Sequence, residues 1–258
     1  MTIPSFVAAT AGGTDATGAW SYTCTAAGAA GRLMILHVMQ CGTSANNAVT
    51  VSSVTNIENL AGTDNVMTAL AATGTGFGSA VVGYHYLFLG RSLGTSAAVI
   101  TGGNSGSDDL YFRMYEFQNA STGTTLATVI ENATLGAALS AAATNQTISD
   151  VGVTTLGPNR LCCQFVCNDN DNTIGPFTGE TGGDWAEATA EFSSATGTDG
   201  MLSLQTANMV TAGTVDGGTV AMGGATPWSH GVLGLAIRGV SEPYYLSKAG
   251  FGAEARVA

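Results

Sequence analysis

The segments Tyr84-His85-Tyr86-Leu87-Phe88-Leu89 and Tyr111-Phe112-Arg113-Met114-Tyr115-Glu116-Phe117 decide the fold class of this chain. In both segments large apolar side chains recur with a period of two, which is typical of β-strands and not of helices. Aromatic side chains share one face of each segment. We therefore expect half-buried antiparallel strands, each with one face on a core and the other toward solvent.

Similar runs occur along the whole chain, and they are bounded by Gly, Asn, Asp and Pro, which favour turns. The predicted strands are Arg32–Met39, Val49–Val54, Val81–Leu89, Ala97–Thr101, Leu110–Phe117, Thr147–Val153, Leu161–Cys167, Met201–Ala207 and Gly231–Arg238. The strongest apolar run, Leu33–Met39, is far shorter than the roughly 20 residues that span a bilayer, so it predicts a core strand. The Ala- and Thr-rich stretch Leu135–Thr144 is a candidate for a short helix.

The composition also favours an all-β fold. The chain of 258 residues contains 36 glycines and is rich in Ala, Thr and Ser, whereas the helix formers Leu, Glu, Lys and Arg are scarce. Single all-β units commonly reach roughly 200–250 residues. We expect one domain over residues 1–258, a single antiparallel β-sandwich of jelly-roll-like character with long Gly/Asn/Thr-rich loops. Short extended terminal segments are expected at about 1–20 and 241–258.

The charge balance limits the possible partners. Seven Lys and Arg residues stand against 18 Asp and Glu residues, for a formal net charge of −11. Because nucleic-acid affinity depends on Lys and Arg, we expect no nucleic-acid partner. Charged residues make up only 10% of the chain, and a surface of hydroxyls and amides can pack against neighbouring subunits without burying unpaired charge. The alternative is a merely acidic soluble protein.

The beginning of the chain shows no targeting signal. The first basic residue is Arg32, and the opening Met1–Phe6 lacks the charged and apolar regions of a signal peptide. We therefore expect synthesis and folding in a cytoplasm, with no membrane partner.

Five cysteines, Cys24, Cys41, Cys162, Cys163 and Cys167, make an odd number without a metal-type C-x-x-C spacing. On a strand, Cys162 and Cys163 face opposite sides, and Cys167 shares the face of Cys163. We expect buried, reduced thiols. A disulfide or an intermolecular bridge is the alternative.

The sequence offers little material for catalysis. Of the three histidines, His37 and His85 lie inside apolar strands, as core or interface histidines do, and His230 lies at a strand start. No Gly-x-Ser-x-Gly elbow or phosphate-binding loop is present. The carboxylate pairs are Asp108-Asp109, Glu187/Glu191 and Asp169/Asp171, and nothing places them across a sugar-sized cleft. We expect no enzymatic activity, no catalytic residues and no cofactor.

A calcium site is the strongest metal candidate. The segment Asn168-Asp169-Asn170-Asp171-Asn172 offers hard oxygen ligands, and Glu180 is twelfth counting from Asp169. The sixth position is Ile174, where an EF-hand loop requires glycine. Asp169, Asp171 and Glu180 are therefore weak calcium candidates, and a metal-free turn rich in Asn and Asp is the preferred interpretation.

The order of several short motifs resembles that of a known group of proteins. These motifs are Ile3-Pro4, the strand from Gly31-Arg32-Leu33-Met34, the two aromatic strands, Pro158-Asn159-Arg160-Leu161, Asp184-Trp185-Ala186-Glu187, Gln205-Thr206-Ala207 and the run from Trp228 to Ile237. The chain resembles a loose family of β-sandwich virion proteins of tailed bacteriophages. Many relatives have Gly-Asp-Leu-Leu where this chain has Gly31-Arg32-Leu33-Met34, and it lacks their early Gly-Trp.

The resemblance implies a non-enzymatic bacteriophage virion structural protein, most simply a capsid decoration or cement protein that acts through assembly contacts. Its partners would be other virion proteins of the capsid or tail, and it would form homo-oligomers, with a trimer as one form. The alternative is a tail-fibre or receptor-binding protein that recognises a host glycan through Gly102–Asp109 and Asp169–Glu180. An enzyme acting on cell-surface polymers is the least favoured class.

Overall fold

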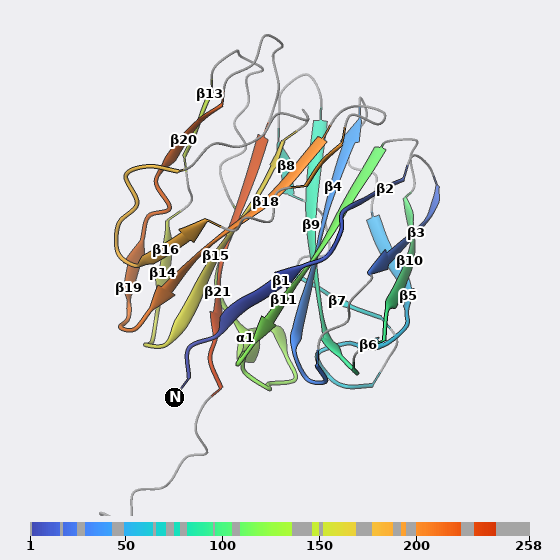
Figure 1. Cartoon of the computed structure of the whole chain (residues 1–258), viewed down its shortest axis with the longest axis horizontal. Helices are drawn as coiled ribbons and strands as arrows, with labels where there is room; N and C mark the ends of the chain where they lie inside the picture. The colour runs from blue at the N-terminus through green and yellow to red at the C-terminus, as the bar shows by residue number, and fades with distance from the viewer. Residues whose placement is uncertain are drawn as a thin grey trace, which may run out of the picture.

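The computed structural model describes residues 2–15, 18–24, 29–42, 49–63, 66–70, 75–77, 82–94, 96–104, 109–135, 146–149, 152–168, 177–187, 192–194, 200–222 and 230–240. Apart from the short helix α1 (Leu126–Val129), the regular elements in these ranges are β-strands (Figure 1). The expected all-β fold class is confirmed. No helix in the described part of the chain is long and apolar enough to cross a membrane.

A central sheet runs through the middle of the molecule, with the strand order β1-β11-β4-β9-β6. β2 also pairs with β11, and both β7 and β8 pair with β9. The strands are β1 (Ser5–Ala9), β2 (Gly13–Asp15), β4 (Leu33–Gly42), β6 (Ile57–Glu58), β7 (Thr68–Ala69), β8 (Thr75–Phe77), β9 (Val82–Ser92) and β11 (Asp109–Gln118). All pair antiparallel, and Leu36 on β4 lies between Met114 on β11 and Phe88 on β9.

Two further sheets and two ribbons complete the described strands. The small sheet has the order β3-β10-β5, and the C-terminal sheet has the order β12-β21-β15-β18-β16, with β17 also paired to β18. The small sheet consists of β3 (Ala19–Cys24), β5 (Val49–Val54) and β10 (Ala98–Asn104). The C-terminal sheet consists of β12 (Ile130–Leu135), β15 (Arg160–Asn168), β16 (Asp184–Glu187), β17 (Phe192–Ser194), β18 (Gly200–Met209) and β21 (His230–Arg238). The ribbons pair β13 (Gln146–Ser149) with β20 (Thr219–Met222) and β14 (Val153–Thr155) with β19 (Gly213–Val215).

The sheets stack in layers, with the small sheet and the C-terminal sheet on opposite faces of the central sheet (Figure 1). Side chains alternate between the faces of a strand. Accordingly, Ile35 and Leu87 pack toward Phe165 of the C-terminal sheet, whereas Leu36 and Phe112 pack toward the small sheet. The molecule is therefore a layered β-sandwich with a hydrophobic core on each side of the central sheet. Jelly-roll-like connectivity remains a prediction.

The expectation of half-buried strands was wrong for the central strands. Most of β11 is buried, including consecutive residues such as Tyr111 and Phe112. Its aromatic side chains also divide between the faces, because Phe117 packs into the core beneath the C-terminal sheet and Phe112 into the other core. Both faces are apolar because a separate sheet covers each of them. Strict alternation of apolar and polar residues is needed only where one face meets water.

Most of the predicted strands match observed ones to within a few residues, and Val49–Val54 matches β5 in full. The predicted strand Thr147–Val153 was wrong as one element, because β13 ends at Ser149 and β14 begins at Val153. Each of the two pairs with a different strand, since Ile148 lies opposite Val220 and Val153 opposite Val215. Of the candidate helix, Leu135 ends β12, and residues 136–144 lie outside the described residues.

The first 20 residues are more than a terminal extension. They include β1, which pairs with β11, and Phe6 on β1 packs edge-on against Phe117 with ring centroids 5.9 Å apart. They also include β2 and the start of β3. The described part of the N-terminal segment therefore belongs to the central sheet and the small sheet. The predicted C-terminal segment, residues 241–258, lies outside the described residues.

Gly102 on β10 leaves room for the Trp20 side chain, the largest in the small sheet, to pack closely against the backbone at that position. Trp20 is buried against Phe112, with ring centroids 4.7 Å apart. A Cβ atom at Gly102 would lie 2.0 Å from the carbonyl oxygen of Thr50 and 2.2 Å from the Trp20 ring. At the next position, Gly103, the nearest atom would be the Thr50 hydroxyl at 3.6 Å, which is ordinary contact. Only the first of these neighbouring glycines is required by packing.

We expect Gly102→Ala to lower the free energy of unfolding by about 1–3 kcal/mol, because the added methyl group displaces Trp20 or the β5 backbone. Gly103→Ala is the matched control and should change stability by less than about 0.5 kcal/mol. Urea denaturation followed by tryptophan fluorescence measures both. Equal effects of the two substitutions would contradict the packing role of Gly102.

Candidate functional site

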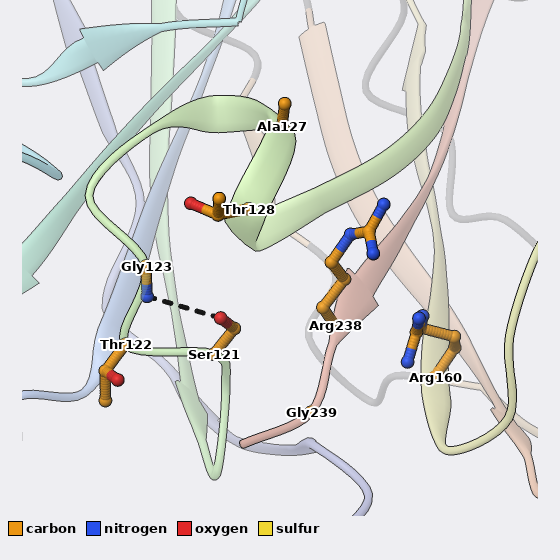
Figure 2. A pocket seen from close by; sticks show the side chains of 8 residues that line it. All are labelled: Ser121, Thr122, Gly123, Ala127, Thr128, Arg160, Arg238 and Gly239. Atoms are coloured by element: carbon orange, nitrogen blue, oxygen red, sulfur yellow. Dashed lines mark hydrogen bonds between the residues drawn. The ribbon is translucent and has the colours of Figure 1, made fainter. Parts of the chain in front are cut away.

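A pocket of about 470 Å³ opens beside helix α1, at the end of the C-terminal sheet (Figure 2). Its described lining consists of Ser121, Thr122, Gly123, Ala127, Thr128, Arg160, Arg238 and Gly239. The Ser121 hydroxyl accepts a hydrogen bond from the Gly123 N–H at 3.2 Å, and Thr128 donates to the Thr125 carbonyl oxygen at 2.8 Å. These two hydroxyls are thus engaged within their own loop, and the charged groups of the lining are two guanidiniums.

Glu131 links those two guanidiniums. Its carboxylate, with a side chain only 1% exposed, lies 3.0 Å from Arg160 Nε and 3.3 Å from Arg238 Nη2. It also accepts the backbone N–H of Leu156. Burial alone would raise the pKa of Glu131, but the Leu156 N–H and the two guanidiniums outweigh burial and hold the pKa below its ordinary value. The carboxylate is therefore ionised at neutral pH and neutralises one of the two positive charges.

The same carboxylate holds the turn between β14 and β15 in place. The turn runs Leu156-Gly157-Pro158-Asn159, and Asn159 has a positive φ of 57°. Glu131 binds both ends of it, through the Leu156 N–H and the Arg160 side chain. The Leu156 side chain is nevertheless 73% exposed. The ion pairs thus hold an apolar side chain in solvent on an anchored turn.

A second exposed apolar side chain lies in the neighbouring turn. Val210, which is 62% exposed, follows β18 and precedes β19. The two turns lie side by side, because Arg160 pairs with Met209 and Thr155 with Gly213. Leu156 and Val210 are therefore two exposed apolar side chains on neighbouring turns, and we call these turns the 156/210 tip.

We expect Glu131→Gln to lower the free energy of unfolding by about 2 kcal/mol, because two adjacent cations lose their counter-charge. The loss should be smaller than for a fully enclosed pair, since the Arg238 side chain is 34% exposed. Asp184→Asn, which changes an exposed carboxyl on β16, is the control. Urea denaturation at neutral pH gives both values, and equal stability of Glu131→Gln and the wild type would show that the ion pairs contribute nothing.

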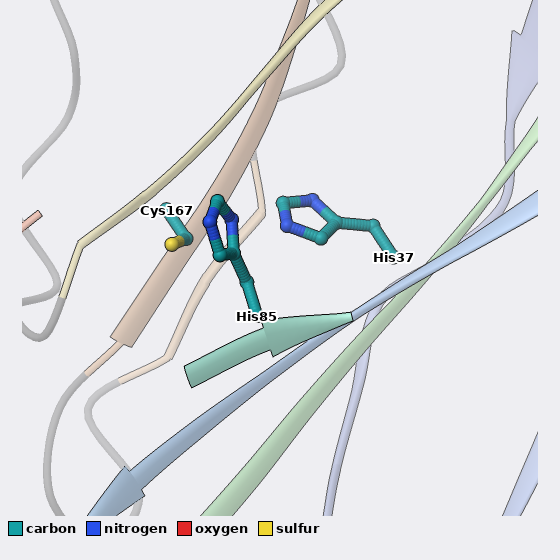
Figure 3. A group of neighbouring side chains, drawn as sticks. All are labelled: His37, His85 and Cys167. Atoms are coloured by element: carbon teal, nitrogen blue, oxygen red, sulfur yellow. The ribbon is translucent and has the colours of Figure 1, made fainter. Parts of the chain in front are cut away.

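A second group of reactive side chains lies inside the molecule, between the central and C-terminal sheets. It consists of His37 on β4, His85 on β9 and Cys167 on β15, and one ligand atom from each lies within 4.8 Å of the others. All three side chains are fully buried or nearly so. Figure 3 shows the three side chains converging, with the His85 ring between His37 and the Cys167 sulfur.

The surroundings of the two imidazoles keep them uncharged. Burial lowers the pKa of His85 to about 3, and burial together with the neighbouring His85 lowers the pKa of His37 well below its ordinary value. The His37 ring packs edge-on against Phe165, with centroids 5.5 Å apart, and 5.8 Å from the His85 ring. Within the described part of the chain, neither nitrogen of His37 has a hydrogen-bond partner. His37 and His85 were predicted to be core or interface histidines, and their burial places them in the core.

These lowered pKa values make stability depend on pH. Between pH 6.5 and the lower folded-state values, the unfolded chain binds more protons than the native chain, so stability falls as the pH falls. We expect a loss of up to about 1.4 kcal/mol per pH unit for each histidine between pH 6 and pH 4. Urea denaturation at several pH values measures the slope. His85→Leu should reduce the slope, and an unchanged slope would show that His85 is not held neutral.

All five cysteines are buried and none is part of a disulfide, as predicted. Cys163 packs toward the central sheet and Cys162 away from it, which confirms their opposite faces. Cys167 contacts the central sheet on the same side as Cys163. Burial raises the pKa of the Cys162 thiol to about 12 and that of Cys163 well above its ordinary value. Both thiols are therefore protonated at neutral pH.

The other sequence-based site candidates are only partly placed. Asp169 and Asp171 lie outside the described residues, and Glu180 is a half-buried residue before β16. The calcium hypothesis therefore stays a prediction. Of the carboxylate pairs, Asp108 and Glu191 also lie outside the described residues.

Sequence reasoning missed two groupings, the Glu131 ion pairs and the convergence of His37, His85 and Cys167. A histidine within an apolar strand signals a buried polar group. No local pattern, however, indicates which distant strand faces it.

Comparison with known proteins adds no assignment, since no family model matches the chain and no curated protein matches it.

Proposed function

We propose that this protein is a non-enzymatic structural component of a bacteriophage particle, of the capsid decoration or cement type, that acts through assembly contacts. The proposal begins from the resemblance of the motif order to β-sandwich virion proteins. The observation that carries it is the 156/210 tip, in which an anchored turn holds Leu156 exposed beside Val210.

The anchoring of the tip favours binding. A contact loses affinity when a mobile loop must be ordered, whereas a turn already held in one conformation avoids that cost. Glu131 anchors this turn, because its carboxylate accepts hydrogen bonds from the Leu156 N–H at the start of the turn and from the Arg160 side chain just after it. Burying a leucine or valine side chain against a neighbouring protein is worth about 1.5–3 kcal/mol. The tip is therefore suited to an assembly contact, and we assign the capsid shell as its partner.

The low charge content supports the same role. Charged residues make up 10% of the chain, so that a contact formed around the tip encloses few charges that need partners. The negative net charge, −11, disfavours a role on packaged nucleic acid. Homo-oligomer formation, with a trimer as one form, is part of the proposal, and so is location in the virion.

Immunogold electron microscopy of particles from a producing culture, with antibody against this chain, tests the proposal. We expect gold over the heads. Gold confined to tail tips would favour the alternative, a tail-fibre or receptor-binding protein that recognises a host glycan. Protein found only in the soluble lysate, with unlabelled particles, would refute a virion role.

The tip itself is tested by Leu156→Ser combined with Val210→Ser. We expect head labelling to fall at least about tenfold, because each side chain loses its apolar contact with the shell. Leu93→Ser is the matched control, since Leu93 is a 51% exposed leucine on the turn after β9. Equal labelling of the wild type and the tip variant would place the contact elsewhere.

A further inference from the structure

The buried cluster of His37, His85 and Cys167 has the composition of a metal centre. We propose that these side chains bind one thiophilic metal ion, Cu⁺ in preference to Zn²⁺, which ties the central sheet to the C-terminal sheet. Their ligand atoms lie within 4.8 Å of one another. Imidazole and thiolate are ligands that copper and zinc accept, whereas calcium and magnesium prefer oxygen.

A second observation points independently to a missing ligand. His37 is fully buried, and no described residue forms a hydrogen bond with either of its ring nitrogens. The hydroxyl of Tyr115, on the adjacent strand β11, is also buried and has no hydrogen-bond partner among the residues that the structure describes. Buried polar groups are normally satisfied, and an exception calls for an explanation such as a bound ion. A metal ion bonded to His37 supplies the partner that this side chain lacks.

The arrangement of the cluster suits coordination. Metal–ligand bonds of roughly 2.0–2.3 Å separate the ligand atoms of a trigonal centre by roughly 3.5–3.8 Å. The widest gap of 4.8 Å therefore has to close by about 1 Å, which small side-chain rotations can achieve. Both imidazoles are neutral, so each offers a lone pair. The Cys167 thiol loses its proton to solvent as the metal–sulfur bond forms.

Charge favours the monovalent ion. Cu⁺ with one thiolate and two neutral imidazoles forms a neutral unit, whereas Zn²⁺ leaves one positive charge in a buried site. An uncompensated buried charge is costly. Arg113 would add to that cost, because it lies opposite His37 on β11. Zinc also prefers four ligands in structural sites, and three converge here. Met39, opposite His85 and packed in the same cluster as Cys167, adds a further soft sulfur nearby.

The ion would join distant parts of the chain. His37 and His85 belong to adjacent strands of the central sheet, whereas Cys167 belongs to β15 in the C-terminal sheet. Because the side chains are buried, the ion enters during folding or through opening of the core. An ion that binds only the native state stabilises it in proportion to the logarithm of its concentration.

The experiment is refolding of the full chain from urea, under reducing and oxygen-free conditions, with Cu⁺, with Zn²⁺ or with neither. After removal of loose metal, we expect one equivalent of copper per chain, and an X-ray absorption spectrum with one sulfur and two nitrogen neighbours. With free Cu⁺ a hundredfold above its dissociation constant, the melting temperature should rise by about 5–10 °C. Zn²⁺ should bind more weakly.

Single substitutions distinguish copper binding at this cluster from copper binding at any buried thiol. Cys167→Ser and His85→Gln should each lower copper affinity more than tenfold. Cys163→Ser is the matched control, because Cys163 is buried on the same strand and faces the same sheet, and it should retain one equivalent. Circular dichroism confirms that each variant is folded.

Three results would overturn the proposal. Absence of stoichiometric binding of either ion would refute the site, and so would equal binding by the wild type and Cys167→Ser. Binding of zinc but not copper would refute the choice of ion. The particle-labelling experiment does not depend on any of these outcomes.

Discussion

Burial of both faces of β4, β9 and β11 is the constraint on which the rest of the structure depends. These long strands carry apolar side chains at both odd and even positions. A single sheet packed on one face would therefore leave the apolar side chains of the other face in water. The small sheet, built from early strands and β10, covers one face, and the C-terminal sheet covers the other. The two halves of the chain are thereby joined through a shared middle layer, and each core includes side chains from that layer.

A polar group in the central sheet costs free energy to bury, because another sheet lies on each of its faces and excludes water. Glu131 lies outside that layer, on β12 of the C-terminal sheet. It combines burial with ion pairs to Arg160 and Arg238, and its satisfied carboxylate also fixes a surface turn. His37, in the middle layer, stays neutral, and its ring nitrogens have no hydrogen-bond partner among the described residues. A buried polar group that is satisfied contributes to structure, whereas one that is not satisfied calls for an explanation, such as the bound ion proposed for His37.

The two proposals therefore concern different parts of the molecule. The 156/210 tip lies on the surface, where the Glu131 ion pairs anchor the turn of Leu156, and it is suited to contacts between proteins. The His37, His85 and Cys167 cluster is an inner feature, and a metal ion there would strengthen the joint between the two large sheets.

The sequence by itself determined the all-β class, most of the strand positions and the burial of the cysteines and of His37 and His85. Local periodicity and turn residues carry that information, because they act over a few neighbouring residues. Only the tertiary structure decided that both faces of β11 are covered, that Thr147–Val153 divides between two ribbons, and that Glu131 meets Arg160 and Arg238. It also brought Cys167 to the two histidines. Such pairings depend on which sheet stacks on which, and strand periodicity is the same for every possible partner.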